Sequence, residues 1–208
     1  MGGERVQAAG DMIGLYERHA ALWDVRRSRA LFERPWLDRF LAPVVPGGTV
    51  LDIGCGSGEP FARHFVDRGY RVVGVDGSES LVALCRARMP DETWHIGDMR
   101  TLALGRAFDA LIAWDSFFHL AAHDQRPMFP VFAAHARPGA PLMFTSGPAR
   151  GEAIGSFGGE PLYHASLDPD EYRALLAENG FEVLVFKAED ADCGGHSVWL
   201  ARKTGGAS

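Results

Sequence analysis

Short apolar runs alternate with segments of helical spacing from Thr49 to the end of the chain. Seven runs predict strands: TVLDI (49–53), RVVGVD (71–76), TWHIG (93–97), FDALIAW (108–114), APLMFTS (140–146), FEVLVFKA (181–188) and HSVWLAR (196–202). The fourth run is nearly continuous in apolar residues, as a strand covered on both faces should be. The alternation predicts an α/β fold, in which a mostly parallel sheet carries helices on both faces.

Helical spacing predicts six helices, at 11–24, 31–41, 59–68, 80–89, 125–136 and 168–178. Ser78 is a good N-cap for the fourth of them, whereas Pro127 and Pro130 crowd the first turn of the fifth. The stretch 147–159 is rich in glycine and predicts an irregular loop. The last two strands are joined by a turn too short for a crossover helix, so we expect them to be antiparallel.

Composition narrows the class of protein. The chain has 208 residues, 47% of them hydrophobic and 23% charged, which suits one domain with its own core. A net charge of −6 gives no sign of the excess positive charge that favours binding of nucleic acid or an anionic membrane. The three cysteines are far apart, and we find neither a membrane-spanning run nor a signal peptide, so we expect a cytoplasmic protein. Cys193 and His196 offer only two metal ligands, and we expect no metal site.

The stretch VLDIGCGSGEPFARHF (50–65) places three glycines at alternate positions where a strand gives way to a helix. These are Gly54, Gly56 and Gly58. Glycine permits positive φ and lets a ligand approach the backbone, and ligands of open α/β sheets bind at the carboxyl ends of strands. Glu59 stands where a dinucleotide fingerprint has its third glycine, and no Lys-Ser/Thr pair indicates a P-loop. Asp52, at the end of the strand, would repel a pyrophosphate and hold an ammonium group.

A second acidic residue, Asp76, ends the next strand, where a carboxylate can accept hydrogen bonds from both hydroxyls of a ribose. Asp98 and Met99 follow the third strand, in GDMR, and are suited to an adenine amino group and ring; Asp98 alternatively serves only as a helix N-cap. A ligand with a ribose, a purine and an ammonium group, and no essential phosphate, fits S-adenosylmethionine (SAM).

These stretches resemble the Rossmann-like class I SAM-dependent methyltransferases. The segments VLDIGCGSG, VVGVDGS, GDMR and FDALIAWDSFFHL match that family's motifs in order and at its usual spacing, and the resemblance covers roughly residues 16–203. It implies a three-layer sandwich around a seven-stranded sheet whose last strand is antiparallel, with an N-terminal helical lid. The nearest resemblance is to small bacterial members of undefined substrate.

The resemblance also implies the cofactor site. The residues expected around SAM are Tyr16, Asp52, Gly54, Cys55, Gly56, Gly58, Asp76, Gly77, Ser78, Asp98, Met99, Trp114 and Asp115. In one interpretation Tyr16 belongs to a lid over the cofactor; ordinary helix packing accounts for it equally well. The chain then divides into N-terminal helices (1–45), a SAM-binding core (46–145) and an acceptor-side loop with a C-terminal helix and hairpin (146–208).

Methyl transfer from a sulfonium is an in-line displacement, in which the protein chiefly aligns the reactants and excludes water. A general base is needed only for an acceptor such as a hydroxyl, and the candidates are His119, His164 and, after them, Asp115. His119 also fits a purely structural role. We expect a small-molecule acceptor with an O, N or S nucleophile, and a monomer or homodimer.

Three other functions remain open: methylation of a protein or nucleic acid, binding of SAM without catalysis, and NAD-dependent oxidoreduction. The chain lacks the Asn/Asp-Pro-Pro-Tyr/Phe motif of many nucleic-acid amino-methyltransferases, which disfavours the first. The missing third glycine disfavours the last.

Overall fold

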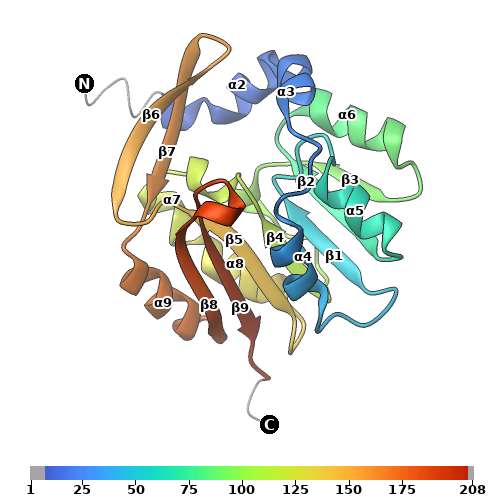
Figure 1. Ribbon diagram of the computed structural model, residues 1–208, viewed down its shortest axis with the longest axis vertical. Helices are drawn as coiled ribbons and strands as arrows, with labels where there is room; N and C mark the ends of the chain where they lie inside the picture. The colour runs from blue at the N-terminus through green and yellow to red at the C-terminus, as the bar shows by residue number, and fades with distance from the viewer. Residues whose placement is uncertain (1–7, 206–208) are drawn as a thin grey trace.

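A seven-stranded sheet forms the centre of the molecule, in the order β3-β2-β1-β4-β5-β9-β8 (Figure 1). This computed structural model describes residues 8–205. The strands are β1 (Thr49–Ile53), β2 (Arg71–Asp76), β3 (Thr93–Ile96), β4 (Ala110–Ala113), β5 (Pro141–Ser146), β8 (Phe181–Asp190) and β9 (His196–Lys203). β9 runs antiparallel to both of its neighbours, and the other pairs are parallel. The predicted mostly parallel sheet with an antiparallel last strand is confirmed.

Helices cover both faces of the sheet and complete three layers. Alternate strand residues point to opposite faces, so Val50 packs in one apolar cluster and Leu51 in the other. The first cluster includes side chains of α4 (Arg34–Leu41), α5 (Phe61–Asp67) and α6 (Glu79–Arg88). The second includes side chains of α8 (Met128–His135) and α9 (Pro169–Glu178). Ser78 caps α6 as expected, since its hydroxyl accepts a hydrogen bond from the Leu81 N–H.

Two predicted helices are interrupted. The segment 11–24 forms α2 (Met12–Arg18) and α3 (Ala20–Arg26), separated at His19, whose backbone leaves the helical region (φ −112°, ψ 17°). The segment 125–136 is replaced by α7 (Ala122–Gln125) and α8, with Pro127 between them. Proline has no N–H to continue a helical ladder, so the distortion expected there becomes a break.

The prediction of an irregular loop at 147–159 is wrong. Residues Gly151–Phe157 form β6, which pairs with β7 (Glu160–Ser166) as a two-stranded antiparallel sheet of its own rather than as an edge of the main sheet. The turn between them is Gly158-Gly159, with φ of 62° and 87°, which suits a two-residue hairpin turn. Two of the five glycines that suggested irregularity therefore make the turn of a regular hairpin.

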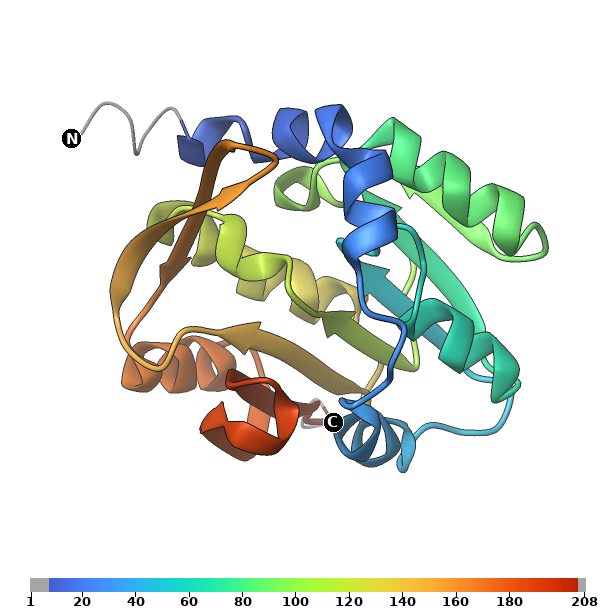
Figure 2. The ribbon, with the colours of Figure 1, turned by 45° about the horizontal axis from the view of Figure 1, so that its top comes forward.

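The N-terminal helices and this hairpin meet above the sheet. Figure 2 shows α2 and α3 crossing the top of the molecule, and the tip of the β6–β7 hairpin reaching them. At the tip, Phe157 packs against the rings of Tyr16, His19 and Trp23. Within residues 8–205, none of the helices is both long and apolar enough to cross a membrane.

Candidate functional site

A cavity lies at the carboxyl ends of β1, β2 and β4, beneath α2. It brings together nine of the residues predicted from the sequence: Tyr16, Gly54, Gly56, Asp76, Gly77, Asp98, Met99, Asp115 and His119. An adjoining pocket adds three more: Asp52, Cys55 and Trp114. Gly54, Gly56, Trp23 and Asp115 line both, so the two spaces are parts of one site.

The glycine loop is fixed by close contacts. The N–H groups of Gly54 and Cys55 both donate to the carbonyl oxygen of Val75, at 2.7 and 3.1 Å, which ties the loop to the end of β2. Gly54 has φ +79°, and a Cβ there would lie 2.2 Å from that of Ser116. A larger residue would meet both steric strain and a clash, so the spacing of glycines reflects packing of the loop as well as access for a ligand.

Asp76 lines the cavity at the end of β2. Its Oδ2 accepts from the Gly56 N–H at 2.8 Å, and its Oδ1 accepts from the Ser78 N–H at 2.9 Å. Each carboxylate oxygen has two lone pairs, so both keep an acceptor position. Burial raises the pKa of Asp76 even though these backbone donors lower it. The carboxylate is thus held in a fixed orientation, suited to a ligand with two neighbouring hydroxyls.

Asp52 is buried, with 4% of its surface exposed. Burial, together with repulsion from Asp76, raises its pKa to about 7, although Arg27 acts in the opposite direction. Among the described residues, no side chain forms an ion pair with it. A buried carboxylate without a cation of its own favours a bound positive charge.

The far end of the cavity is lined by Asp98, Met99 and Arg100. Asp98 caps the short helix η1 (Met99–Thr101) through the Arg100 N–H, and it also forms an ion pair with the Arg100 side chain. Asp98 is therefore an N-cap, and its additional contact with an adenine remains a prediction. From α2, Ile13 lies against Gly77, where an added Cβ would be 2.6 Å from the Ile13 side chain.

A buried hydrogen-bonded chain joins Tyr16, His119 and the hairpin. His119, at the end of η2 (Phe117–His119), has its Nδ1 2.7 Å from the Tyr163 carbonyl oxygen and its Nε2 2.8 Å from the Tyr16 hydroxyl. Because a carbonyl only accepts, we assign the proton to Nδ1, and Nε2 then accepts from Tyr16. Burial lowers the pKa of His119 to about 4 and raises that of Tyr16. Both groups are therefore neutral around pH 7.

Three predicted residues lie outside both pockets. Gly58 packs against α6, where a Cβ would be 2.5 Å from the end of Met89. Ser78 is buried as a helix cap and donates to Glu17. His164 lines a separate cavity between β5 and the hairpin, with its ring 4.9 Å from that of His119. Gly58 and Ser78 thus support the loop and helix around the site, and His164 lies behind it.

Arg27 was not identified from the sequence. It follows α3, lines the pocket with Asp52, and lies between the carboxylates of Glu33 and Asp115, 3.6 Å from each. Its guanidinium also lies 5.5 Å from the centre of the Phe61 ring. Its position in the basic run RRSR gives no sign of this environment, because the run reads as an exposed helix end. It is well placed for an anionic group in the pocket.

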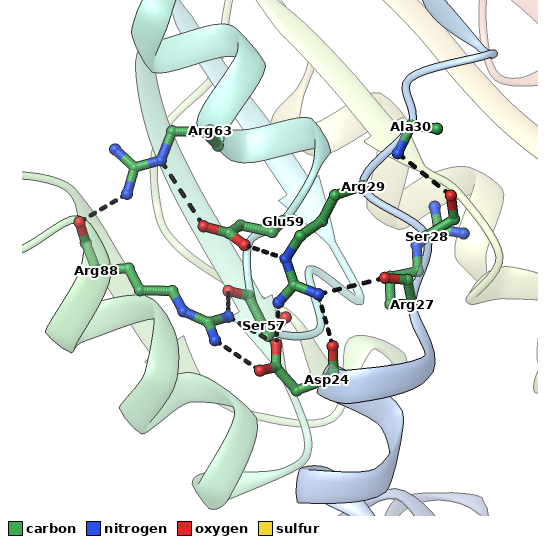
Figure 3. Close-up of polar contacts among 9 residues, drawn as sticks. All are labelled: Asp24, Arg27, Ser28, Arg29, Ala30, Ser57, Glu59, Arg63 and Arg88. Carbon is green, nitrogen blue, oxygen red and sulfur yellow. Dashed lines mark hydrogen bonds and ion pairs between the residues drawn. The ribbon is translucent and has the colours of Figure 1, made fainter.

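Salt bridges fasten the N-terminal segment over the glycine loop. Asp24 pairs with Arg88 at the end of α6, at 2.6 Å, and Arg29 pairs with both Asp24 and Glu59 (Figure 3). The hydrogen bonds from Arg88 lower the pKa of Asp24 to about 2.

Glu17, on α2, adds a second attachment to α6. Its carboxylate accepts from the hydroxyls of Ser78 and Ser80, each at 2.6 Å, and these bonds lower its pKa to about 2. At the hairpin tip, Glu160 binds Arg18 and His19, at 2.6 and 2.7 Å. We call α2, α3 and the hairpin tip the roof of the site. Within the part of the chain described, no group of three or more His, Cys, Asp or Glu is arranged to hold a metal.

Comparison with known proteins found methyltransferases that are similar to part of this chain. Residues 50–139 match a family model described as a methyltransferase domain. A dTDP-3-amino-3,6-dideoxy-alpha-D-glucopyranose N,N-dimethyltransferase of Streptomyces fradiae is 38% identical over 92 residues, which are 43% of this chain and 36% of that protein. A probable SAM-dependent methyltransferase of Mycolicibacterium smegmatis is 30% identical over 76% of this chain and 59% of its own length. The alignments thus cover little more than a third of the first relative and under two thirds of the second.

Solved structures show the same fold. SAM-bound CalS10, an amino pentose methyltransferase from Micromonospora echinaspora, superposes with a TM-score of 0.68 at 22% identity, covering 90% of this chain and 96% of that one. The expected resemblance to the class I SAM-dependent methyltransferases is confirmed, in fold and in the motif-bearing core.

Proposed function

We propose that this chain is a SAM-dependent methyltransferase that acts on an amino group of a small molecule. The match of its core to a methyltransferase domain supports the reaction class. The state of His119, with both ring nitrogens engaged, is the observation that favours an amine over other acceptors.

The site suits SAM in three places. The Asp76 oxygens keep acceptor positions for ribose hydroxyls, the buried Asp52 suits the ammonium group, and Arg27 suits the carboxylate of the amino-acid part. When bound, SAM supplies a methyl group on a sulfonium, which makes the methyl electrophilic and the sulfur a good leaving group.

A hydroxyl acceptor would need a base that removes its proton near pH 7. His119 does not meet this requirement, because its pKa is about 4 and its free lone pair accepts from Tyr16. Asp115 is already engaged by His196, at 2.8 Å, and lies near Arg27. A neutral amine attacks with its own lone pair and needs no such base, so the site suits amine methylation.

Tyr16 then has a positioning role toward the acceptor. Its hydroxyl proton goes to His119 Nε2, and its oxygen lone pairs are left to accept an N–H of the amine. This fixes the nitrogen relative to the cofactor, and the roof keeps water out; both effects lower the barrier of an in-line displacement. After transfer, the methylated nitrogen carries the extra proton and releases it to water.

The cavity also limits the charge and size of the acceptor, and the cysteines indicate the compartment of the protein. The acids that line the cavity, Asp76, Asp98 and Asp115, disfavour an anionic acceptor, and the roof leaves space for a small one. The three cysteines are unpaired and buried, which suits the reducing cytoplasm.

The test is methyl transfer from radiolabelled SAM to matched acceptors that share one sugar scaffold and carry an amine, a hydroxyl or a carboxylate. We expect turnover with the amine, at a rate that rises with pH as the amine loses its proton. Preferred turnover of the hydroxyl or carboxylate analogue would contradict the amine assignment. Binding of SAM without turnover of small molecules, but with labelling of RNA or protein, would support one of the alternatives instead.

A further inference from the structure

A cluster of four charged side chains lies at the edge of the cofactor pocket and comes from three distant parts of the chain. Arg27 and Glu33 flank the connection between α3 and α4, Asp115 follows β4, and His196 begins β9. His196 Nε2 lies 2.8 Å from Asp115 Oδ1, and Arg27 lies 3.6 Å from Asp115 Oδ2. Asp115 has φ +49°, an unusual value for a residue other than glycine. Its carboxylate is thus held in place by contacts from two other elements and by its own backbone.

The contacts of His196 define its charge. Its Nδ1 lies 2.6 Å from the Cys193 carbonyl oxygen, which only accepts, so this nitrogen carries a proton. Its Nε2 faces a carboxylate oxygen and carries a second proton in a charge-assisted hydrogen bond. The bond to Asp115 raises the pKa of His196, against the opposing effect of burial.

The carboxylates of Glu33 and Asp115 lie at the same distance from Arg27. Glu33 is 1% exposed, its Oε2 has no hydrogen-bond partner among the described residues, and burial raises its pKa. Burial thus disfavours the charged form of Glu33, and Asp115 is the second carboxylate that lies 3.6 Å from Arg27. With His196 charged, Oδ1 of Asp115 is bound to the imidazolium, and Arg27 stays at 3.6 Å rather than in a close pair.

We propose that His196 is a positioning residue for cofactor binding: its imidazolium holds Asp115 and so leaves Arg27 available to the carboxylate of the cofactor. This inference rests on the proposed use of SAM. If His196 loses its charge, Asp115 forms a close ion pair with Arg27, and the net charge of the pocket becomes more negative. Binding of the amino-acid part of the cofactor then weakens as pH rises through the raised pKa of His196.

Other titrating groups act around the same pocket. Toward His196 face Asp115 and Glu33, with Cys193 on its own turn η3 (Ala191–Cys193) and the Lys187–Asp190 pair of β8 beyond it. Asp52, with a pKa of about 7, has the opposite effect, because its charging strengthens the binding of an ammonium. Asp52 contributes equally to wild type and to a His196 variant. The ratio of their affinities for the same ligand at each pH therefore isolates the contribution of His196.

The test is calorimetric titration with two ligands, S-adenosylhomocysteine (SAH) and 5′-methylthioadenosine, which lacks the amino-acid part. Wild type, His196→Gln, His196→Lys and the exposed-histidine control His95→Gln are compared at pH 6, 7.5 and 9. We expect His196→Gln to bind SAH about tenfold more weakly than wild type at pH 6, which corresponds to a coupling of one pKa unit, and to approach wild type at pH 9. His196→Lys keeps its charge and should retain tight SAH binding at pH 9.

Methylthioadenosine should bind all four proteins alike, because it makes no use of Arg27. Equal weakening of both ligands in His196→Gln would indicate loss of structure and overturn the proposal, as would an SAH affinity ratio that stays constant with pH. If wild type binds methylthioadenosine but not SAH, or neither, the proposed function itself fails.

Discussion

The floor and the roof of the site are built by different physical means. The floor consists of the ends of β1, β2 and β4, where Asp52 is 4% exposed and the glycine loop is held by backbone hydrogen bonds. The roof combines ring contacts, such as those of Phe157 with Tyr16 and Trp23, with ion pairs near the surface, such as Arg18–Glu160, whose side chains are 45% and 38% exposed. Buried, hydrogen-bonded polar groups are costly to disturb, whereas exposed ion pairs contribute little individually.

This difference separates residues that determine ligand affinity from residues that determine how fast a ligand enters and leaves. The floor fixes the shape and charge offered to a ligand, and its variants should change equilibrium affinity. The exposed ion pairs of the roof are individually weak, and variants of these pairs should mainly change the rates of ligand exchange. Opening of the roof belongs to the low-stability motions of a fold.

The largest effect is expected at the floor, from Asp76→Ala. Loss of the acceptor of two ribose hydroxyls should weaken SAM affinity about 100-fold or more, since hydrogen bonds to a charged group contribute about 1.5–3 kcal/mol each. Calorimetry measures the affinity, and circular dichroism checks that the fold remains. An affinity within threefold of wild type would mean that the ribose is held elsewhere.

Asp52→Asn should weaken SAM and SAH about tenfold at pH 8 and leave methylthioadenosine unaffected, because that ligand has no ammonium. The raised pKa of Asp52 also predicts that the free protein loses stability as pH rises from about 4 to 7, because in this range folding requires the carboxylate to take up a proton. Thermal unfolding at pH 8 should therefore show the Asn variant to be more stable than wild type. A less stable variant would indicate that Asp52 already has a cationic partner.

Tyr16→Phe tests whether a roof residue also serves the chemistry. Removing the hydroxyl should lower kcat about tenfold, while the Kd for SAH changes less than twofold, because the group acts on the acceptor. The matched control is Tyr70→Phe, a half-buried tyrosine in the turn between α5 and β2. A loss confined to SAH affinity would make Tyr16 a cofactor contact only.

The smallest effect is expected from Glu160→Gln, which removes the ion pairs between the hairpin tip and α2. SAH release, followed by stopped flow, should speed up two- to threefold at low salt, and its dependence on ionic strength should become weaker. Glu182→Gln is the control, since it breaks another exposed pair, with Arg202, at the far edge of the sheet. Release rates identical to wild type would show that the roof opens elsewhere.

The floor was predictable from sequence because each of its parts lies next to a strand end. The glycine loop, Asp76 and Asp98 follow successive strands, and parallel topology brings such ends to one edge. Arg27 and His196 were not recognised as site residues because their neighbours come from segments as distant as β4 and β9. Nor did the sequence separate the regular hairpin from an irregular loop, since the glycines of the Gly158-Gly159 turn suit both.

The β6–β7 hairpin has a consequence for how this architecture can diversify. It forms its own small sheet, and its backbone pairs with none of the seven central strands. The parts of the hairpin that do not contact α2 or His119 can therefore vary without altering strand register in the central sheet. Grafting hairpins of different size onto this chain would be a direct way to vary the roof of the site while preserving the central sheet beneath it.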